Sequence, residues 1–209
     1  MLEDYRRYPI GIQNFQQLRN NDCVYVDKTE LVYRLTHTDR VYFLSRPPPF
    51  RQEPLVSTLE AYFQGKKDLF GGLAMERWEK DWESYLVLHI DFSLTKYMEL
   101  TDLTGQLNLF LHRWEKIYGK DEAEKTASER LQGIILRASE QIGKQVVVLI
   151  DEYDAPLLDS NSDTALQQQL RNEMRKFFSP PQEVGAVSSL SLHHRHQQVQ
   201  PTEHLQRTE

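Results

Sequence analysis

Three short apolar segments along the chain have the pattern of buried strands. They are VYFLS (41–45), LVLHIDFS (86–93) and VVVLID (146–151). Within each segment the apolar residues follow one another almost without interruption, instead of alternating with polar residues. Continuous apolar runs are typical of parallel strands whose two faces are both covered by helices.

Segments with helical spacing lie between and after these strands. In residues 164–178 the apolar side chains Leu166, Leu170, Met174 and Phe177 fall on one stripe of a helix. Similar spacing occurs in residues 27–37, 55–65, 102–118 and 121–142. The alternation of strands and helices predicts an α/β fold, with a parallel sheet flanked by helices.

The last part of the chain has a different composition. Residues 181–209 contain four of the seven histidines and many glutamines, and they show no lasting apolar period. Such a segment does not bury enough apolar surface to offset the entropy of ordering, so we predict disorder. The sequence therefore divides into one α/β domain, residues 1–180, and a disordered tail, residues 181–209.

Composition narrows the class of protein. The chain has 209 residues, of which 39% are hydrophobic, and its net charge is −6. An acidic balance disfavours a general nucleic-acid binder or a binder of anionic membranes.

The single Cys23 excludes an intrachain disulfide and a zinc site built from several cysteines. The N-terminus lacks a signal-peptide pattern and no apolar run could span a bilayer, so we expect a cytoplasmic protein. The oligomeric state is left open.

Two acids end the most apolar strand. Asp151 and Glu152 follow VVVLI directly. A buried parallel strand that ends in carboxylates is where P-loop NTPases hold Mg²⁺ and polarise water. We therefore take Asp151 as a candidate metal ligand, and both acids as candidate catalytic residues. The alternative interpretation is a strand that ends in solvated acids. Asp91, at the end of LHID, is either a further acid beside the site or the N-cap of the next segment.

A phosphate-binding loop should follow the first strand and open a helix. That position, residues 46–54, reads RPPPFRQEP and contains neither Gly nor Lys. Proline lacks the backbone N–H that a phosphate cradle needs. By its own residues this loop is therefore a poor phosphate site.

The chain resembles the bacterial AAA-ATPase-like proteins, which often carry a nuclease-like C-terminal domain. The resemblance extends from about Tyr8 to Pro180 and rests on segments in the same order and spacing. They are YPIGIQNF (8–15), YVDKTEL (25–31), YFLSRP (42–47), LVSTLEAYFQGKKDLFGGL (55–73), LHIDFS (88–93), VVVLIDEYDAPL (146–157) and LRNEMRKFFSP (170–180).

This resemblance implies a P-loop NTPase-type sheet, ATP as ligand and Mg²⁺ as cofactor. The family loop reads approximately RPRRFGKSLL, which makes Arg46, Arg51, Gln52 and Glu53 the phosphate-loop positions of this chain. Arg51 stands where the family has Gly, Gln52 where it has Lys, and Glu53 where it has Ser. The loop is therefore a degenerate one, and we expect the chain as written to be inactive as an ATPase.

A shift of reading frame accounts for these departures. If residues 51–53 are encoded CGG CAA GAG and a C follows, reading one base later gives Gly-Lys-Ser. Suitable codons for residues 192–209, read one base later, give FITGISKFSQLSIFSEL, which resembles the next strand and turn of the family. A real frameshift in the gene and an error in the determined DNA sequence would both give the residues seen here. On this interpretation the sheet is incomplete at the C-terminus, and the strand 146–151 lacks a neighbour on one side.

Two other functions are compatible with the residues. The scaffold could serve as an interaction or regulatory module that does not need nucleotide. A nuclease is a weaker option, because the acids of DEYDAP (151–156) have no Lys near them in sequence.

Overall fold

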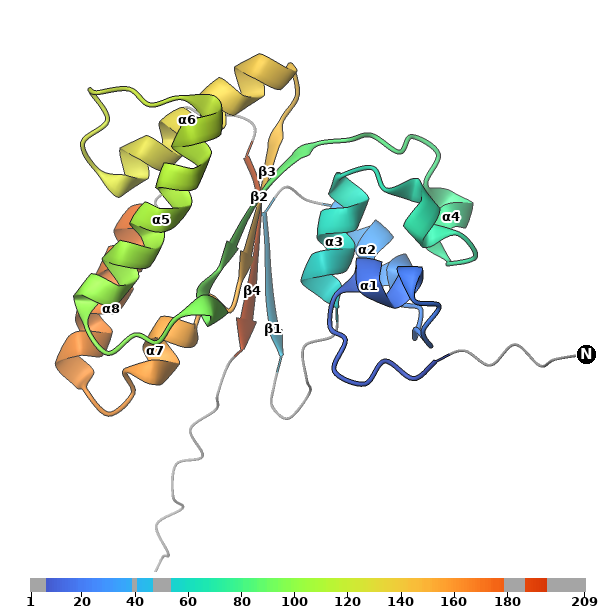
Figure 1. The fold of residues 1–209 in the computed structure, drawn as a ribbon, viewed down its shortest axis with the longest axis horizontal. Helices are drawn as coiled ribbons and strands as arrows, with labels where there is room; N and C mark the ends of the chain where they lie inside the picture. Colours follow the sequence, from blue (N-terminus) through green and yellow to red (C-terminus); the bar gives the residue numbers. More distant parts are fainter. Residues whose placement is uncertain (1–6, 39–40, 47–53, 179–186, 195–209) are drawn as a thin grey trace, which may run out of the picture.

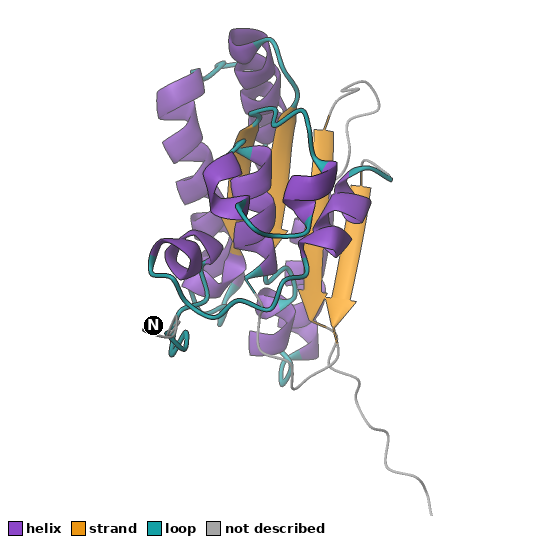
Figure 2. Cartoon of the chain, turned by 90° about the vertical axis from the view of Figure 1, so that its right-hand side faces the viewer, coloured by secondary structure: helices purple, strands orange, loops and turns teal. Residues whose placement is uncertain are grey.

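The four strands that the structure describes form one parallel sheet between two layers of helices (Figure 1). The computed structural model describes residues 7–38, 41–46, 54–178 and 187–194. Across the sheet the order is β1 (Val41–Arg46), β4 (Val187–His194), β3 (Val146–Asp151) and β2 (Leu86–Asp91). All the neighbouring pairs are parallel, so the four strands end at the same edge (Figure 2).

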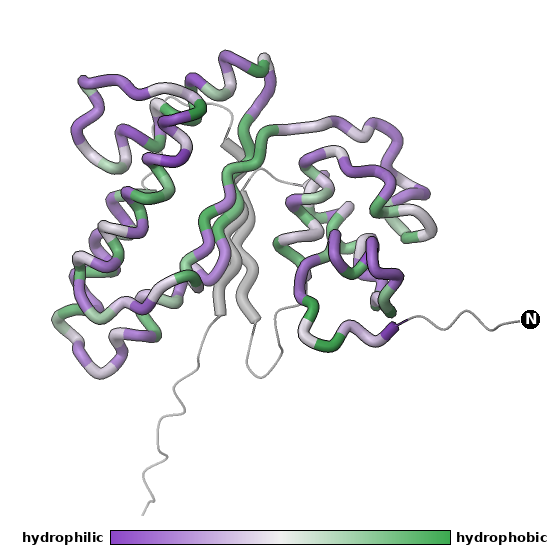
Figure 3. Tube along the Cα trace, in the orientation of Figure 1, coloured by the Kyte–Doolittle hydropathy of each residue, from purple (hydrophilic) through white to green (hydrophobic). Residues whose placement is uncertain are grey.

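Strand β3 lies inside the sheet and is buried on both faces. Val146, Val148 and Ile150 pack into one apolar cluster, whereas Val147 and Leu149 pack into a second cluster on the opposite face. This explains the unbroken apolar run of the strand, because each side chain in turn meets a helical layer. The hydropathy along the trace agrees with this, because β2 and β3 carry continuous apolar stretches whereas the helices alternate between apolar and polar residues (Figure 3).

The layer on one face comes from the N-terminal part of the chain. It contains α1 (Phe15–Asn20), α2 (Thr29–Thr36), α3 (Leu55–Phe63), the 3₁₀ turn η1 (Lys67–Phe70) and α4 (Met75–Trp78). Two contacts tie it together. The Phe15 backbone N–H donates to Ser57 Oγ at 2.9 Å, which fixes α1 beside the first turn of α3. The Asp27 carboxylate accepts from the backbone N–H groups of Thr29 and Ala74, at 2.9 and 2.6 Å, and so joins α2 to α4.

The second layer contains the longer helices. It is built from η2 (Phe92–Leu94), α5 (Leu100–Tyr118), α6 (Ala127–Ile142), α7 (Ala155–Asp159) and α8 (Thr164–Phe177). Helix α6 starts at a capping box, in which Thr126 and Glu129 each accept from the other's backbone N–H, and it ends at Gly143 with φ +69°. Helix α8 starts at Asp163, whose side chain accepts from the Leu166 backbone N–H. These caps satisfy N–H groups that the helices themselves leave without partners.

Two ion pairs hold α6, one to α5 and one to the loop between α5 and α6. Arg130 donates to the Glu115 carboxylate with Nε and Nη2, at 2.6 and 2.9 Å, and this lowers the pKa of Glu115 despite its burial. Arg137 donates to Glu124 in the connecting loop. The Glu124 carboxylate crosses so close to Gly133 of α6 that a Cβ there would overlap Glu124 Oε1.

The main correction to the sequence-based expectations concerns the segment after residue 180. Residues 187–194 form β4, which pairs with β1 on one side and β3 on the other. The expectation of disorder fails for these eight residues, and so does the expectation that β3 lacks a neighbour. VSSLSLHH has little periodicity of its own, but a place between two strands offers backbone hydrogen bonds on both sides. The other residues of 181–209 lie outside the described residues.

Gly133→Ala tests the crossing of Glu124 over α6. An alanine in a helix interior normally stabilises a protein by about 1 kcal/mol relative to glycine. Here we expect no gain, because the new methyl group would push the Glu124 carboxylate away from Arg137. Urea unfolding of the two proteins measures the difference.

Two further variants make this test specific. Gly105→Ala in α5, where a Cβ would meet nothing within 4 Å, should give the ordinary gain of about 1 kcal/mol. Gly133→Ala should also give this gain in stability in a Glu124→Ala background, where the carboxylate is absent. A full gain from Gly133→Ala alone would show that the crossing is absent.

Candidate functional site

Two acid-bearing strands end side by side at the carboxyl edge of the sheet. Asp91 of β2 is the register partner of Asp151 of β3. Neighbouring strands are about 4.8 Å apart, so the two backbones present their acids as close neighbours. By strand alternation both residues lie on the face of Leu149, which packs toward α3. Asp91 also accepts from the Ser93 backbone N–H at 2.8 Å, which confirms the N-cap alternative for this residue and keeps it beside Asp151.

The turn after β3 gives Glu152 an unusual backbone conformation. Its φ is +52°, a left-handed value that a residue with a side chain rarely adopts. The Asp151 side chain accepts from the Glu152 backbone N–H at 3.0 Å, and the Glu152 carbonyl accepts from the Ala155 N–H at 2.9 Å. Asp154, the N-cap of α7, is only 6% exposed. These hydrogen bonds hold the backbone of the turn that carries Asp151 and Glu152 at the sheet edge.

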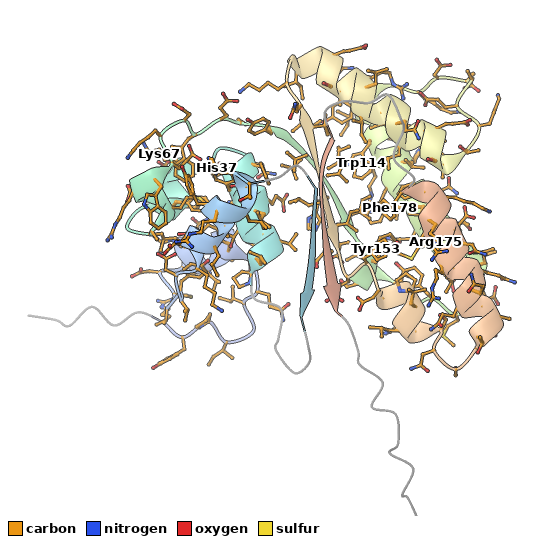
Figure 4. All side chains as sticks on the ribbon, turned by 180° about the vertical axis from the view of Figure 1, so that it is seen from behind. His37, Lys67, Trp114, Tyr153, Arg175 and Phe178 are labelled. Carbon is orange, nitrogen blue, oxygen red and sulfur yellow. The ribbon has the colours of Figure 1, made fainter. Side chains whose placement is uncertain are left out.

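An aromatic cluster supports this turn from the side of α8. The ring of Tyr153 lies 5.6 Å from that of Phe178 and 6.5 Å from that of Phe92. Figure 4 shows Tyr153 and Phe178 between the sheet and α8, with Arg175 further out on the helix. Burial raises the pKa of the Tyr153 hydroxyl. Tyr153 is therefore a packing residue of the turn that follows the two acids.

A half-buried ion pair lies next to the acids, on the face toward α3. His89 Nδ1 of β2 lies 3.4 Å from Glu60 Oε2 of α3. Burial alone would lower the pKa of His89, but the hydrogen bond to Glu60 and the charges of Glu60, Asp151 and Asp91 raise it overall. The same hydrogen bond lowers the pKa of Glu60 more than its burial raises it. This pair joins α3 to the strand that carries Asp91.

Neither His89 nor Glu60 was expected at the site from the sequence. A signal was present for His89, because it precedes Asp91 by two residues in LHID and must share its face of the strand. No comparable signal exists for Glu60, since its contact with His89 depends on how α3 packs across the sheet.

The expected phosphate-loop positions connect β1 to α3. Arg46 is the last residue of β1, and its backbone is in register with that of His194 of β4. Arg51, Gln52 and Glu53 lie outside the described residues. Helix α3 begins at Leu55, and the Pro54 carbonyl accepts from the Thr58 N–H at 2.8 Å and from the hydroxyls of Ser57 and Thr58. The loop therefore leaves the same sheet edge at which Asp151 lies.

Metal-ligand clusters and membrane-spanning helices are both absent from the described part of the chain. Within the described ranges, no group of three or more His, Cys, Asp or Glu side chains is arranged to hold a metal ion. None of the helices that the structure describes has the length and apolar character needed to cross a membrane.

Comparison with known families decides what kind of domain this is. A sequence profile of the AAA-ATPase-like family, described as a predicted AAA-ATPase, matches residues 9–190. The chain belongs to this family. The match includes part of β4, in agreement with the place of that strand in the sheet.

One curated relative of this chain is described as uncharacterized. It is the uncharacterized protein in the vnfD 5′ region of Azotobacter chroococcum mcd 1, which is 34% identical to this chain over 177 residues. The alignment covers 83% of this chain and 34% of the relative, so the chain spans about a third of the length of that protein. No solved structure matches the chain.

The shifted pKa values of His89 and Glu60 predict how His89→Gln changes stability with pH. A raised His89 pKa stabilises the fold below about 6.5, the ordinary histidine value, and this contribution is lost as pH rises through the raised value. A lowered Glu60 pKa stabilises the fold above its ordinary value of 4.5. We therefore expect His89→Gln to lower the melting temperature most near pH 5.5, and least near pH 8.5. Thermal unfolding at the two pH values measures this.

The matched control is the same substitution in a Glu60→Gln background. Without the carboxylate, the effect of His89→Gln should lose most of its dependence on pH. An effect of equal size at both pH values in the otherwise unchanged chain would contradict the pairing.

Proposed function

We propose that the carboxyl edge of this sheet is a Mg²⁺–ATP site of the P-loop type, and that only its acidic half is intact in this chain. The observation that carries the proposal is the register of Asp91 with Asp151, at the edge from which the β1–α3 connection also leaves. In the proposed site Asp151 would hold Mg²⁺, and Glu152 would orient and polarise the attacking water. Bound Mg²⁺ would neutralise charge on the transferred phosphate.

The strand order supports this arrangement. β4 lies between β1 and β3, so the ends of the loop-bearing strand and the acid-bearing strand are separated by two strand spacings, about 10 Å. A phosphate chain held over the β1–α3 connection would reach the acids across the end of β4. Since Mg²⁺ takes few protein ligands when phosphate supplies the others, a single carboxylate from Asp151 is sufficient.

The phosphate half does not fit ATP, as judged by its sequence. Gln52 lacks the charge that would hold the β- and γ-phosphates, and Glu53 adds a carboxylate where an anion should bind. Three consecutive prolines, residues 47–49, lack backbone N–H donors. Loss of one charge-stabilising group commonly reduces the rate by about 10²–10³-fold. The proposed function is therefore an ATPase-type domain that does not turn over ATP as written.

The alternative is a nucleotide-independent interaction module on the same scaffold. It is favoured by apolar side chains exposed on the N-terminal layer, which are Tyr8 (79%), Ile10 (91%), Val26 (72%) and Leu31 (61%). Exposed apolar side chains that gather in one patch are typical of a protein-binding site. The two functions differ in ATP binding by the chain with a restored phosphate loop. The ATPase-type domain would then bind ATP, whereas the interaction module has no need of it.

Restoring the loop tests the proposal. The repaired chain carries Pro48→Arg, Pro49→Arg, Arg51→Gly, Gln52→Lys, Glu53→Ser and Pro54→Leu. We expect it to bind Mg²⁺–ATP at least about tenfold more tightly than the chain as written, because hydrogen bonds to a charged phosphate contribute about 1.5–3 kcal/mol each. Isothermal titration calorimetry gives both affinities.

The control keeps five of the six substitutions and replaces Gln52→Lys by Gln52→Met, which should lose most of the gain. Adding Asp151→Ala to the repaired chain should weaken binding of Mg²⁺–ATP more than binding of metal-free ATP. The proposal is wrong if the unrepaired chain binds as tightly as the repaired one. It is also wrong if the unrepaired chain hydrolyses ATP in a manner that Asp151→Ala abolishes.

A further inference from the structure

The backbone of Glu152 is in a conformation that must be imposed from outside the turn. At φ +52° a residue with a Cβ is disfavoured by about five- to thirtyfold in its conformational equilibrium relative to glycine. Such a conformation persists only where the surrounding structure determines it. The two local hydrogen bonds, from the Glu152 N–H and to the Glu152 carbonyl, link the residue to Asp151 and Ala155. The bond to Ala155 links the backbone of Glu152 to the position of α7, which begins at that residue.

We propose that Asp159 and Gln167 are positioning residues of the site, which hold α7 so that Glu152 is kept in its left-handed conformation. Neither residue is part of the proposed site itself, and both would act through the backbone of α7. The functional meaning of this inference rests on the proposed function, because Glu152 is the acid that would orient water there.

Asp159 fastens the end of α7 to the segment that follows β2. Its Oδ2 accepts from the Tyr97 backbone N–H at 3.2 Å, and its Oδ1 accepts from Lys96 Nζ at 3.0 Å. Tyr97 is fully buried, and its hydroxyl donates to the Phe92 carbonyl at 2.9 Å. Tyr97, which binds Asp159, is therefore itself held to Phe92, the residue directly after Asp91 at the same sheet edge.

Gln167 fastens the middle of α7 to α8. Its Nε2 donates to the Leu157 carbonyl at 3.0 Å. Helix α8 is itself held to the sheet by three side chains that are at most 2% exposed, Leu170, Met174 and Phe177. With Asp159 on one side and Gln167 on the other, α7 is attached to both elements that flank it in this layer.

The test measures how strongly the fold requires a left-handed residue at position 152. Glu152→Ala and Glu152→Gly differ only in the Cβ, so the ratio of their unfolding equilibrium constants reports this requirement. We expect Ala to unfold several-fold more readily than Gly in the otherwise unchanged chain. In an Asp159→Ala background, and separately in a Gln167→Leu background, the ratio should fall toward one because α7 is released.

Two controls separate positioning from general loosening. Gly143 is the left-handed C-cap of α6, and a Cβ at this residue would meet nothing within 4 Å. Gly143→Ala should therefore lose the same stability in every background. Lys96→Met removes only the partner that is 82% exposed and leaves the Tyr97 bond, so it should keep the ratio at position 152.

The inference is overturned if the ratio at position 152 is unchanged in both backgrounds, or if the cost of Gly143→Ala falls in parallel with it. Should Asp159→Ala fail to fold, Asp159→Asn replaces it as the milder background, beside Gln167→Leu. No nucleotide enters these measurements. A negative result would therefore reject the positioning role alone, whereas failure of the repaired loop to bind Mg²⁺–ATP would reject the proposed function alone.

Discussion

The parallel pairing of β2 with β3 is the constraint on which the rest of the structure depends. Because β3 is buried on both faces, a shift of one residue would move its side chains to the opposite helical layers. The two apolar clusters therefore fix the register that places Asp151 beside Asp91. Since all four strands run in the same direction, that edge also receives the connection from β1.

Around this edge the chain gathers like charges and a strained backbone, which destabilise the fold unless neighbouring groups offset them. Two acids in register repel one another, and the charged form of His89 partly offsets this because it is held by Glu60 on the same face. The turn at Glu152 is strained, and α7 is attached to its neighbours by Asp159 and Gln167. Strain and clustered charge are typical of functional sites. Their presence here agrees with membership of the AAA-ATPase-like family.

The strands and long helices could be predicted from the sequence because each has a period or an apolar run of its own. The apolar segments 41–45 and 146–151 match β1 and β3 closely, and the stripe in 164–178 matches α8. Short helices such as α1 and α7 were missed, since five or six residues show too little periodicity. β4 was missed for a different reason, because the strand depends on the two neighbours that pair with it.

The candidate site was predictable to a similar extent. Strand ends identify Asp151 and Glu152, whereas the contacts of Asp159 with Tyr97 and of His89 with Glu60 join segments far apart in the sequence. No local pattern encodes such contacts. The left-handed conformation of Glu152 was likewise not visible, because nothing in DEYD distinguishes it from an ordinary turn.

The most direct test of the account is to locate bound metal–nucleotide on the protein. Mn²⁺–ATP, a paramagnetic substitute for Mg²⁺–ATP, broadens the backbone amide signals of nearby residues in NMR spectra. In the chain with the restored loop, we predict broadening centred on Asp91, Asp151 and Glu152, and none there in the chain as written. Broadening centred elsewhere, or equal broadening at the acids in both chains, would contradict the account.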